Sequence, residues 1–308
     1  MKHIAIIGSF NCHLECIAFL LESFKEDRVT IYITSNSDNY GFLDYYKSLY
    51  KFTILYNFSS QIPHTHNAVF KLTSSDKCVD HEKIISILHF NEPEQLITKS
   101  RRFLSLTPYV KGPNIHYTFP VYSPVIHKTY NKIVTMVGYY TLECFDEDTI
   151  MFINKNKQYI FNFILWGSDD YSRLQSLENV KLYRSLEATA MMNIIHDSKY
   201  ILSKKYINYD RFSGQLGLAV SYEKPLILDV KTKTAYNLPG ITFTNQYSEI
   251  GNLDTIDVDQ YERIQHDIRI LKQELLQKNK STLHSFLEPL RSESSVIYKH
   301  ILTNRRTY

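Results

Sequence analysis

The first 34 residues contain the pattern that most restricts the fold, a strand, a helix and a second strand in close succession. Residues 2–8 form a β-branched run that ends in glycine, residues 12–24 repeat apolar side chains at helical spacing, and residues 29–34 form another β-branched run. Two strands joined through one helix in so few residues predict a parallel βαβ unit. Strands that are apolar at nearly every position predict a sheet covered by helices on both faces. We therefore expect an α/β fold.

The remainder of the first half has weaker patterns. Residues 51–56 predict a third strand, and residues 81–89 and 93–105 favour helices. Residues 107–131 carry four of the nine prolines and have no sustained periodicity, which is typical of a linker or hinge. A first Rossmann-like domain is therefore expected over residues 1–125.

After the proline-rich segment, strands and helices alternate regularly. The predicted strands are residues 132–138, 159–167, 180–183, 200–203 and 225–229. The predicted helices between them are residues 141–155, 186–198 and 213–223. This order predicts a second Rossmann-like domain over residues 126–255, with a ligand in the cleft between the domains at the carboxyl ends of the strands. A long helical pattern follows in residues 256–308 and has the length to pack back on the first domain.

Composition excludes several classes of protein. The net charge of +3 over 308 residues is too small to indicate a nucleic-acid partner or a membrane surface. No apolar run approaches the roughly 18 residues of a transmembrane helix, and the first residues have the pattern of a core strand rather than of a signal peptide. With four cysteines and no secretory signal, we expect a cytoplasmic protein without a disulfide framework.

The most informative stretch lies in residues 211–227. Ser213 and Gly214 open a predicted helix directly after a strand and loop, and Lys224 and Pro225 lead into the next strand. Backbone N–H groups at a helix start bind phosphate or diphosphate, and a glycine leaves them accessible. Ser213 can cap the helix and contact the anion as well. The alternative is that Ser213 is only an N-cap and Gly214 only a packing glycine.

The form Ser-Gly-x-x-x-Leu-Ala, followed by Lys-Pro and a strand, resembles the donor-site element of GT-B fold glycosyltransferases, especially heptosyltransferase-like members. The order of strands and helices is similar to the carboxyl-terminal half of that fold over about residues 131–245. The resemblance implies two Rossmann-like domains that face a cleft, the first for the acceptor and the second for a nucleotide-sugar donor. Many retaining members carry an acidic residue where this chain has Leu218, so the resemblance favours inversion.

The same resemblance implies site residues in the second domain. A metal-independent transferase needs cations to stabilise the departing diphosphate, and Lys204 and Lys205 follow a strand directly. An ordinary exposed lysine pair is the alternative. The expected diphosphate ligands are Ser213, Gly214, Gln215, Lys204 and Lys205, and the expected nucleotide or sugar contacts are Gly138, Ser168 and Arg173.

The loop after the first strand lacks the three-glycine fingerprint of dinucleotide binding, which argues against a nicotinamide or flavin cofactor. The loop resembles the Gly-His-x-x-Pro loop of inverting GT-B enzymes, with Cys12 and Cys16 in place of the glycine and proline. The resemblance implies that His13 is the general base, a role that suits an imidazole, and that Gly8, Ser9 and Asn11 face the acceptor. The alternative is a first-turn helix residue without a catalytic role.

Metal sites are not predicted. Residues 146–148 match the Asp-x-Asp pattern of metal-dependent transferases, but they lie about eight residues past a strand and near a helix start, which favours a solvated first turn. Cys12, His13 and Cys16 lack a fourth zinc ligand.

The sequence thus predicts a metal-independent, inverting glycosyltransferase of glycan biosynthesis, which needs no cofactor and transfers sugar to a glycan or another hydroxyl acceptor. A nucleotide-sugar epimerase with the same donor pocket, or a non-catalytic nucleotide-sugar- or glycan-binding module, remains the alternative.

Overall fold

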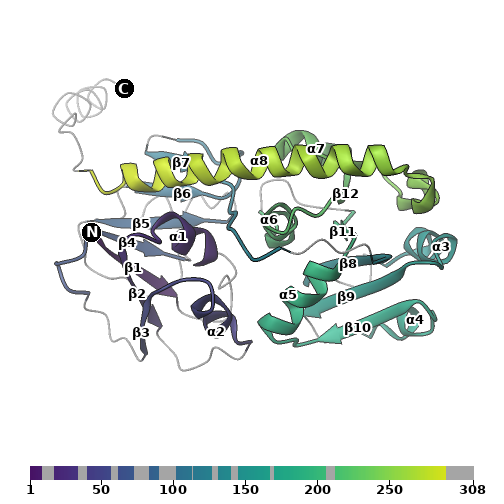
Figure 1. The fold of residues 1–308 in the computed structure, drawn as a ribbon, viewed down its shortest axis with the longest axis horizontal. Helices are drawn as coiled ribbons and strands as arrows, with labels where there is room; N and C mark the ends of the chain where they lie inside the picture. The colour runs from purple at the N-terminus through teal and green to yellow at the C-terminus, as the bar shows by residue number, and fades with distance from the viewer. Residues whose placement is uncertain are drawn as a thin grey trace, which may run out of the picture.

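The computed structural model describes eleven stretches of the chain. They are residues 1–8, 17–33, 40–56, 62–72, 83–89, 102–112, 114–126, 131–139, 145–166, 170–205 and 212–288. Within them the chain forms two parallel sheets side by side, with one long helix across both (Figure 1). The predicted α/β class with two Rossmann-like sheets is confirmed.

The first sheet has seven parallel strands in the order β3-β2-β1-β4-β5-β6-β7. Its strands are β1 (His3–Gly8), β2 (Arg28–Ile33), β3 (Thr53–Tyr56), β4 (Ala68–Lys71), β5 (Ile84–Leu88), β6 (Arg102–Ser105) and β7 (Ile115–Tyr117). The strand order reverses between β1 and β4, where open α/β sheets bind ligands beyond the carboxyl ends of the strands. Gly8 is the last residue of β1 and therefore lies at this edge.

Apolar side chains cover both faces of the first sheet. Ile4 and Ile6 pack in the cluster that includes α1 (Ile17–Ser23), whereas Ala5 and Ile7 pack in a second cluster with Tyr32. Alternate side chains of a strand point to opposite faces, so the unbroken apolar run of β1 fits a strand that is buried on both sides.

The second sheet has six parallel strands in the order β10-β9-β8-β11-β12-β13. Its strands are β8 (Ile133–Tyr139), β9 (Ile160–Trp166), β10 (Val180–Arg184), β11 (Tyr200–Leu202), β12 (Leu226–Asp229) and β13 (Gly240–Phe243). The helices between them are α3 (Glu147–Lys155), α4 (Ser172–Gln175), α5 (Ala188–Asp197), α6 (Gly214–Ser221) and α7 (Val230–Tyr236). In this half the predicted strands and helices agree with the structure to within a few residues, apart from residues 141–144, which lie outside the described stretches.

Three predictions for the first half were wrong. Residues 84–88 and 102–105, expected to be helical, are the strands β5 and β6. All five residues of β5 are buried, and such a short, continuous apolar run cannot be told from a helix by its periodicity alone. The proline-rich stretch also contains a strand, β7, which pairs with β6 in parallel.

The connecting segment, residues 118–126, leads from the first sheet to the second. Phe119 and Val121 are 1% exposed and Tyr122 is 3% exposed, so its first part is packed rather than solvated. The two domains also touch directly: the Tyr45 and Tyr222 hydroxyls are 2.6 Å apart. Tyr45 belongs to α2 (Phe42–Lys47), and Tyr222 ends α6. The domain boundaries at residues 125 and 255 remain predictions.

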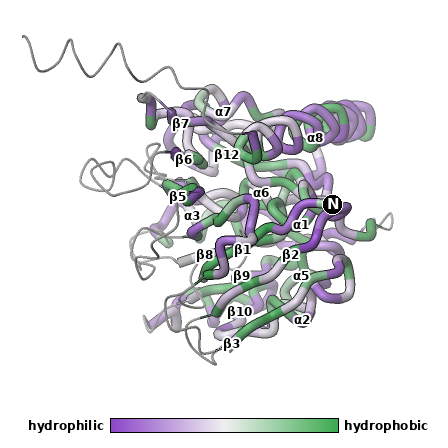
Figure 2. The backbone as a smooth tube through the Cα atoms, turned by 90° about the vertical axis from the view of Figure 1, so that its left-hand side faces the viewer, coloured by the Kyte–Doolittle hydropathy of each residue, from purple (hydrophilic) through white to green (hydrophobic). Residues whose placement is uncertain are grey.

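The long helix α8 (Val258–Ser285) begins on the second domain and ends on the first (Figure 1). Two 3₁₀ turns, at Tyr247–Ile250 and Leu253–Thr255, precede it, and the Asp257 side chain caps its start by accepting from the Gln260 N–H at 2.6 Å. Its hydrophilic and hydrophobic residues alternate (Figure 2), as expected of an amphipathic helix on a protein surface. In the part of the chain that the structure describes, no helix is both long and apolar enough to span a bilayer.

Candidate functional site

The start of α6 has the features of an anion site. Ser213 occupies the N-cap position with an extended backbone, but its hydroxyl makes no capping hydrogen bond. Ser213 and Gly214 are half-buried, and the first turn carries no acidic residue. The first N–H groups of a helix have no intrahelical acceptor, and the helix dipole favours a negative charge beside them. The uncapped Ser213 hydroxyl is therefore compatible with the predicted contact to a diphosphate, and it does not fit the alternative of a plain side-chain cap.

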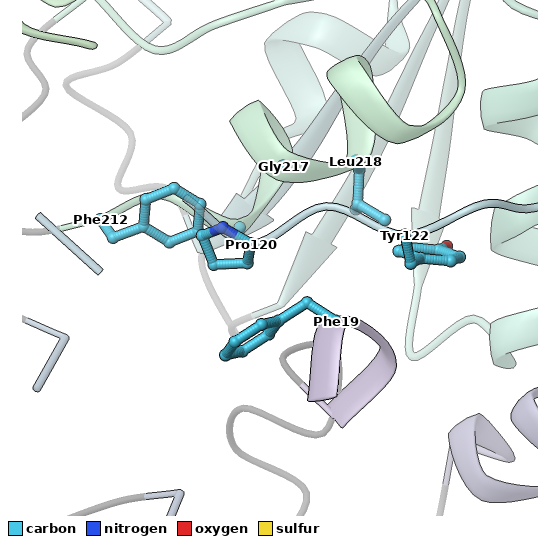
Figure 3. Close-up of a pocket in the computed structure, with 7 residues that line it drawn as sticks. Phe19, Pro120, Tyr122, Phe212, Gly217 and Leu218 are labelled. Atoms are coloured by element: carbon cyan, nitrogen blue, oxygen red, sulfur yellow. The ribbon is translucent and has the colours of Figure 1, made fainter. Parts of the chain in front are cut away.

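A small, mainly apolar void of about 10 Å³, with room for roughly one water molecule, lies beside this helix start, between the two domains (Figure 3). Figure 3 shows Phe19 of α1 below the connecting segment and α6 on its other side. The lining residues are Phe19, Pro120, Tyr122, Phe212, Gly214, Gly217 and Leu218. Because these residues come from the first domain, the connecting segment and the second domain, the start of α6 faces the interdomain space, where the sequence predicted the ligand.

The first domain contacts the approach to α6 through His89. The Phe212 N–H donates to the His89 carbonyl oxygen at 2.9 Å, one residue before the N-cap of α6. His89 follows β5 at the carboxyl edge of the first sheet, and its Nε2–H donates to the Leu72 carbonyl oxygen at 2.7 Å. Sequence reasoning missed His89 because its segment was predicted to be helical. The apolar run that ends at Leu88 is the signal that identifies it as a residue at a strand end.

The predicted diphosphate ligand Lys205 lies in an internal ion cluster. Its ammonium is 2.5 Å from Asp146 Oδ1 and 2.6 Å from Asp148 Oδ2, and its side chain is only 1% exposed. Two carboxylates thus neutralise this buried ammonium, which is not accessible to a diphosphate. Lys204, at the same strand end, is half-buried and becomes the better placed residue of the pair.

The Asp-x-Asp stretch forms a helix start, as predicted, and the predicted solvated first turn is confirmed for Glu147 but wrong for Asp148, which is buried. Asp146 caps α3 by accepting from the Thr149 N–H at 3.0 Å. Asp148 is buried and accepts from the Tyr247 N–H at 2.7 Å and the Ser248 N–H at 3.0 Å. Burial alone raises the pKa of both carboxyls, but the hydrogen bonds from Lys205 and from N–H groups outweigh it and lower both pKa values. These carboxylates therefore hold protein groups rather than presenting themselves to a metal.

The remaining predicted residues lie at separate points. Gly138, the second-last residue of the strand β8, has φ 149°, a backbone region that favours glycine. Arg173, on α4, is exposed and forms an ion pair with Glu147 in the first turn of α3. Lys205 pairs with Asp148 in the same turn, so both predicted cations are bound to the start of α3. Gln215 is buried in the first turn of α6. The predicted residues Ser9, Asn11, His13 and Ser168 lie outside the described residues.

Among the described residues, no group of three or more His, Cys, Asp and Glu side chains is placed to hold a metal ion. Cys12, His13 and Cys16 are not among them. The arrangement that the structure does describe presents the backbone N–H groups at the start of α6 at the interdomain face of the second sheet.

Comparison with known proteins identifies the fold. The sequence matches no protein-family model and no curated protein sequence. Among solved structures, the chain is similar to Anabaena HepE in complex with UDP and glucose, with a TM-score of 0.64 at 10% identity over 93% of this chain and 99% of that one. It is also similar to AviGT4, a glycosyltransferase involved in avilamycin A biosynthesis (TM-score 0.55, 8% identity, 93% and 97% covered). A third match is the glycotransferase of kitacinnamycin (TM-score 0.54, 9% identity, 93% and 99% covered).

These similarities extend over nearly the whole of both chains, so the two sheets and their relative order match as one unit. The expected GT-B fold is therefore confirmed over most of the chain. Identities near 10% show the fold and leave the reaction to be argued from the site.

Proposed function

We propose that this chain is a glycosyltransferase that moves a sugar from a nucleoside-diphosphate-sugar to a hydroxyl acceptor, without a metal and with inversion. The observation that carries the proposal is the start of α6, which faces the interdomain space between two Rossmann-like sheets: the Ser213 hydroxyl makes no capping hydrogen bond, Gly214 has no side chain, and the first turn carries no acidic residue. The GT-B fold of the chain supports it, as does the presence of UDP and glucose in the similar HepE structure.

On the donor side, the N–H groups at Ser213, Gly214 and Gln215 would hold the diphosphate. Negative charge develops on the diphosphate as it leaves, and donors fixed in advance stabilise such charge most strongly in a site that excludes water. Lys204 would add a cation from the end of β11. Gly138, Ser168 and Arg173, at or after the ends of β8 and β9, would line the nucleotide pocket.

On the acceptor side, Gly8, Ser9, Asn11 and His13 follow β1 in the first domain. In the proposed reaction the acceptor oxygen forms a bond to the anomeric carbon while the bond from that carbon to the diphosphate oxygen breaks. His13 takes the proton of the acceptor hydroxyl, and the departing diphosphate keeps the electron pair. A single displacement of this kind inverts the anomeric configuration.

The donor site is tested by thermal unfolding of the purified protein with UDP, GDP, dTDP, CMP, ADP and NAD, each with and without Mn²⁺. A ligand at 100 times its dissociation constant adds about 2.7 kcal/mol to the stability and raises the unfolding temperature by several degrees. We expect one nucleoside diphosphate to produce such a shift, and the shift to be the same with and without Mn²⁺.

The variant Gly214→Leu should abolish the shift because its side chain covers the N–H groups of the first turn. Gly112→Leu is the matched control, since Gly112 precedes β7 and is remote from α6 in the chain. The unfolding temperature of each variant without ligand shows whether it is folded, and Gly214→Ala serves as a milder change. Absence of a shift with every diphosphate, or a full shift in Gly214→Leu, would overturn the proposed donor site.

A further inference from the structure

The C-terminal end of α6 is held by α8 through ionic and polar contacts. Lys272 Nζ is 3.1 Å from Glu223 Oε1, and Arg269 Nε is 3.2 Å from Glu223 Oε2. The Gln265 side chain donates to the Glu223 carbonyl oxygen at 3.4 Å. Gln265, Arg269 and Lys272 are spaced by four and three residues and thus lie on one face of α8. Three residues on one face of α8 therefore bind Glu223, which lies just past the end of α6.

Glu223 has an unusual backbone conformation for a residue with a side chain. Its φ of 56° lies in the left-handed region, which helices often adopt at the residue after the C-cap and which glycine usually occupies. The Glu223 N–H also donates to the Val220 carbonyl oxygen at 3.1 Å. The Lys224 N–H donates to the Ala219 carbonyl oxygen at 2.8 Å, so backbone hydrogen bonds of α6 itself hold this helix end, and the contacts to α8 fix the Glu223 side chain.

Lys272 is buried in this contact, with a side chain that is 4% exposed. Burial lowers its pKa, and the charge of Glu223 offsets part of this effect. A buried ammonium needs a charged or hydrogen-bonding partner; Glu223 supplies the hydrogen bond here, and Glu22 of α1 adds a second negative charge nearby. The side chain of Glu223 is therefore held in a fixed position against α8.

The other half of α8 is anchored outside the second domain. The Asn279 side chain donates to the Phe119 carbonyl oxygen at 2.7 Å and accepts from the Thr118 hydroxyl, both in the connecting segment. The His284 imidazole is 3.1 Å from the carbonyl oxygen of Ser23, at the end of α1. Figure 1 shows the helix running across both domains. Through α8, the end of α6 is fixed relative to the first domain.

An eight-residue helix is a short rod of about 12 Å, so a displacement at one end of α6 moves the other end. We infer that Lys272 is a positioning residue for the donor site. By holding Glu223 against α8, Lys272 fixes the position of α6. The N–H groups of Ser213 and Gly214 are thereby placed, and their position determines the affinity for the diphosphate. The inference rests on the proposed function. Lys272 itself does not touch the donor.

The test compares two lysines of the same helix. Lys278 lies on α8 with its ammonium 5.4 Å from the centroid of the Tyr117 ring, and it contacts the first domain rather than α6. The dissociation constant of the nucleoside diphosphate that stabilises the wild type most, among UDP, GDP, dTDP and ADP, is measured by calorimetry for the wild type, Lys272→Met and Lys278→Met. We expect a rise of roughly tenfold in Lys272→Met, within the range typical of coupling between sites, and no change in Lys278→Met.

Two further measurements separate positioning from a general loss of structure. Lys272→Arg keeps the positive charge and should recover most of the affinity, and Glu223→Gln should weaken binding if Lys272→Met folds poorly. In transfer assays, Lys272→Met should raise the KM for the donor and leave kcat nearly unchanged, because the reacting atoms keep their catalytic groups.

The outcomes distinguish this inference from the proposed function. Equal dissociation constants for the wild type and Lys272→Met, with both proteins folded, would overturn the positioning role and leave the proposed function intact. Equal weakening in Lys272→Met and Lys278→Met would also overturn it, since it would report only the loss of positive charge. If the wild type binds no nucleoside diphosphate, the proposed function fails and the positioning role fails with it.

Discussion

The carbonyl oxygen of Pro120 lies 2.5 Å from the place that a Cβ atom on Gly217 would occupy. The connecting segment can cross α6 this closely only because residue 217 has no side chain. The Tyr122 N–H then donates to the Ser221 hydroxyl at 3.1 Å, so the segment follows α6 for about one turn. This glycine in the middle of a helix is thus explained by the contact between the domains.

We predict that Gly217→Ala destabilises the protein by about 1–3 kcal/mol, as overpacking does. In an unconstrained helix the same change would stabilise by roughly 0.5–1 kcal/mol, so the sign is diagnostic. Urea unfolding measures the difference. Gly112→Ala is the control because its new Cβ would meet only the flexible end of the Ile115 side chain, at 2.9 Å. A Gly217→Ala protein that is more stable than the wild type would contradict this prediction, because it would show that the connecting segment can shift away from α6 without loss of stability.

Most strands of the second half could be predicted from the sequence because they are largely apolar runs that alternate at regular intervals with helical patterns, although β13 was missed. In the first half, polar residues within strands break the pattern: Lys71, Ser86 and Ser105 are all buried strand residues. The strand β7 has three residues and no fully buried position. Such strands are specified by their neighbours in the sheet, which local periodicity does not reveal.

The candidate site divides in the same way. Ser213 and Gly214 could be identified because a helix start is a local signal. The partner of Lys205 could not, since Asp146 lies 59 residues away in the chain and only the fold brings them together. His89 and Glu223 were missed for the same reason, because their roles depend on Phe212 and Lys272, which are distant in sequence.

The buried ion cluster predicts a strong effect of Asp148→Asn. Removing this carboxylate leaves Lys205 with Asp146 alone and deprives the Tyr247 and Ser248 N–H groups of a charged acceptor. Breaking a buried ion pair costs about 3–5 kcal/mol, and the remaining partner should keep the loss near the lower end. Glu147→Gln is the matched control. Its carboxylate forms an exposed pair with Arg173, which is worth about 0–1 kcal/mol.

The same cluster predicts acid sensitivity. The pKa of Asp148 lies below its ordinary value of 3.8 in the folded protein, because hydrogen bonds from Lys205 and from N–H groups outweigh burial. The unfolded chain therefore binds the proton more tightly than the folded protein. The contribution of Asp148 to the free energy of unfolding is complete above pH 3.8, and it is lost as the pH falls through the lower pKa of the folded protein. Urea midpoints measured between pH 5 and 2.5 should fall less steeply for Asp148→Asn than for the wild type. Parallel slopes would contradict this prediction.

A second pH effect is expected near neutrality, at His3. The centroids of the His3 and His66 rings are 3.8 Å apart, and the Nε2 atom of His3 is 3.0 Å from the Thr30 hydroxyl oxygen. Burial first, and then the charges of His66 and Arg28, lower its pKa from the ordinary 6.5. Stability from this group is complete above pH 6.5 and is lost as the pH falls through the lowered folded pKa. His3→Gln should therefore flatten the loss of stability between pH 7.5 and 5, whereas His266→Gln, on the exposed face of α8, should not.

The role proposed for His13 predicts a change in rate without a change in donor affinity. If His13 takes the acceptor proton, His13→Ala should lower kcat by about 10²–10⁴-fold, the usual contribution of a general base. The dissociation constant of the nucleoside diphosphate should stay within twofold, because the proposed donor site is at α6 in the other domain. Transfer assays and calorimetry measure the two quantities, with His266→Ala as the control. An unchanged kcat in His13→Ala would remove His13 from the mechanism. The proposed donor site at Ser213 and Gly214 would then still stand, because it rests on the start of α6 and not on the base.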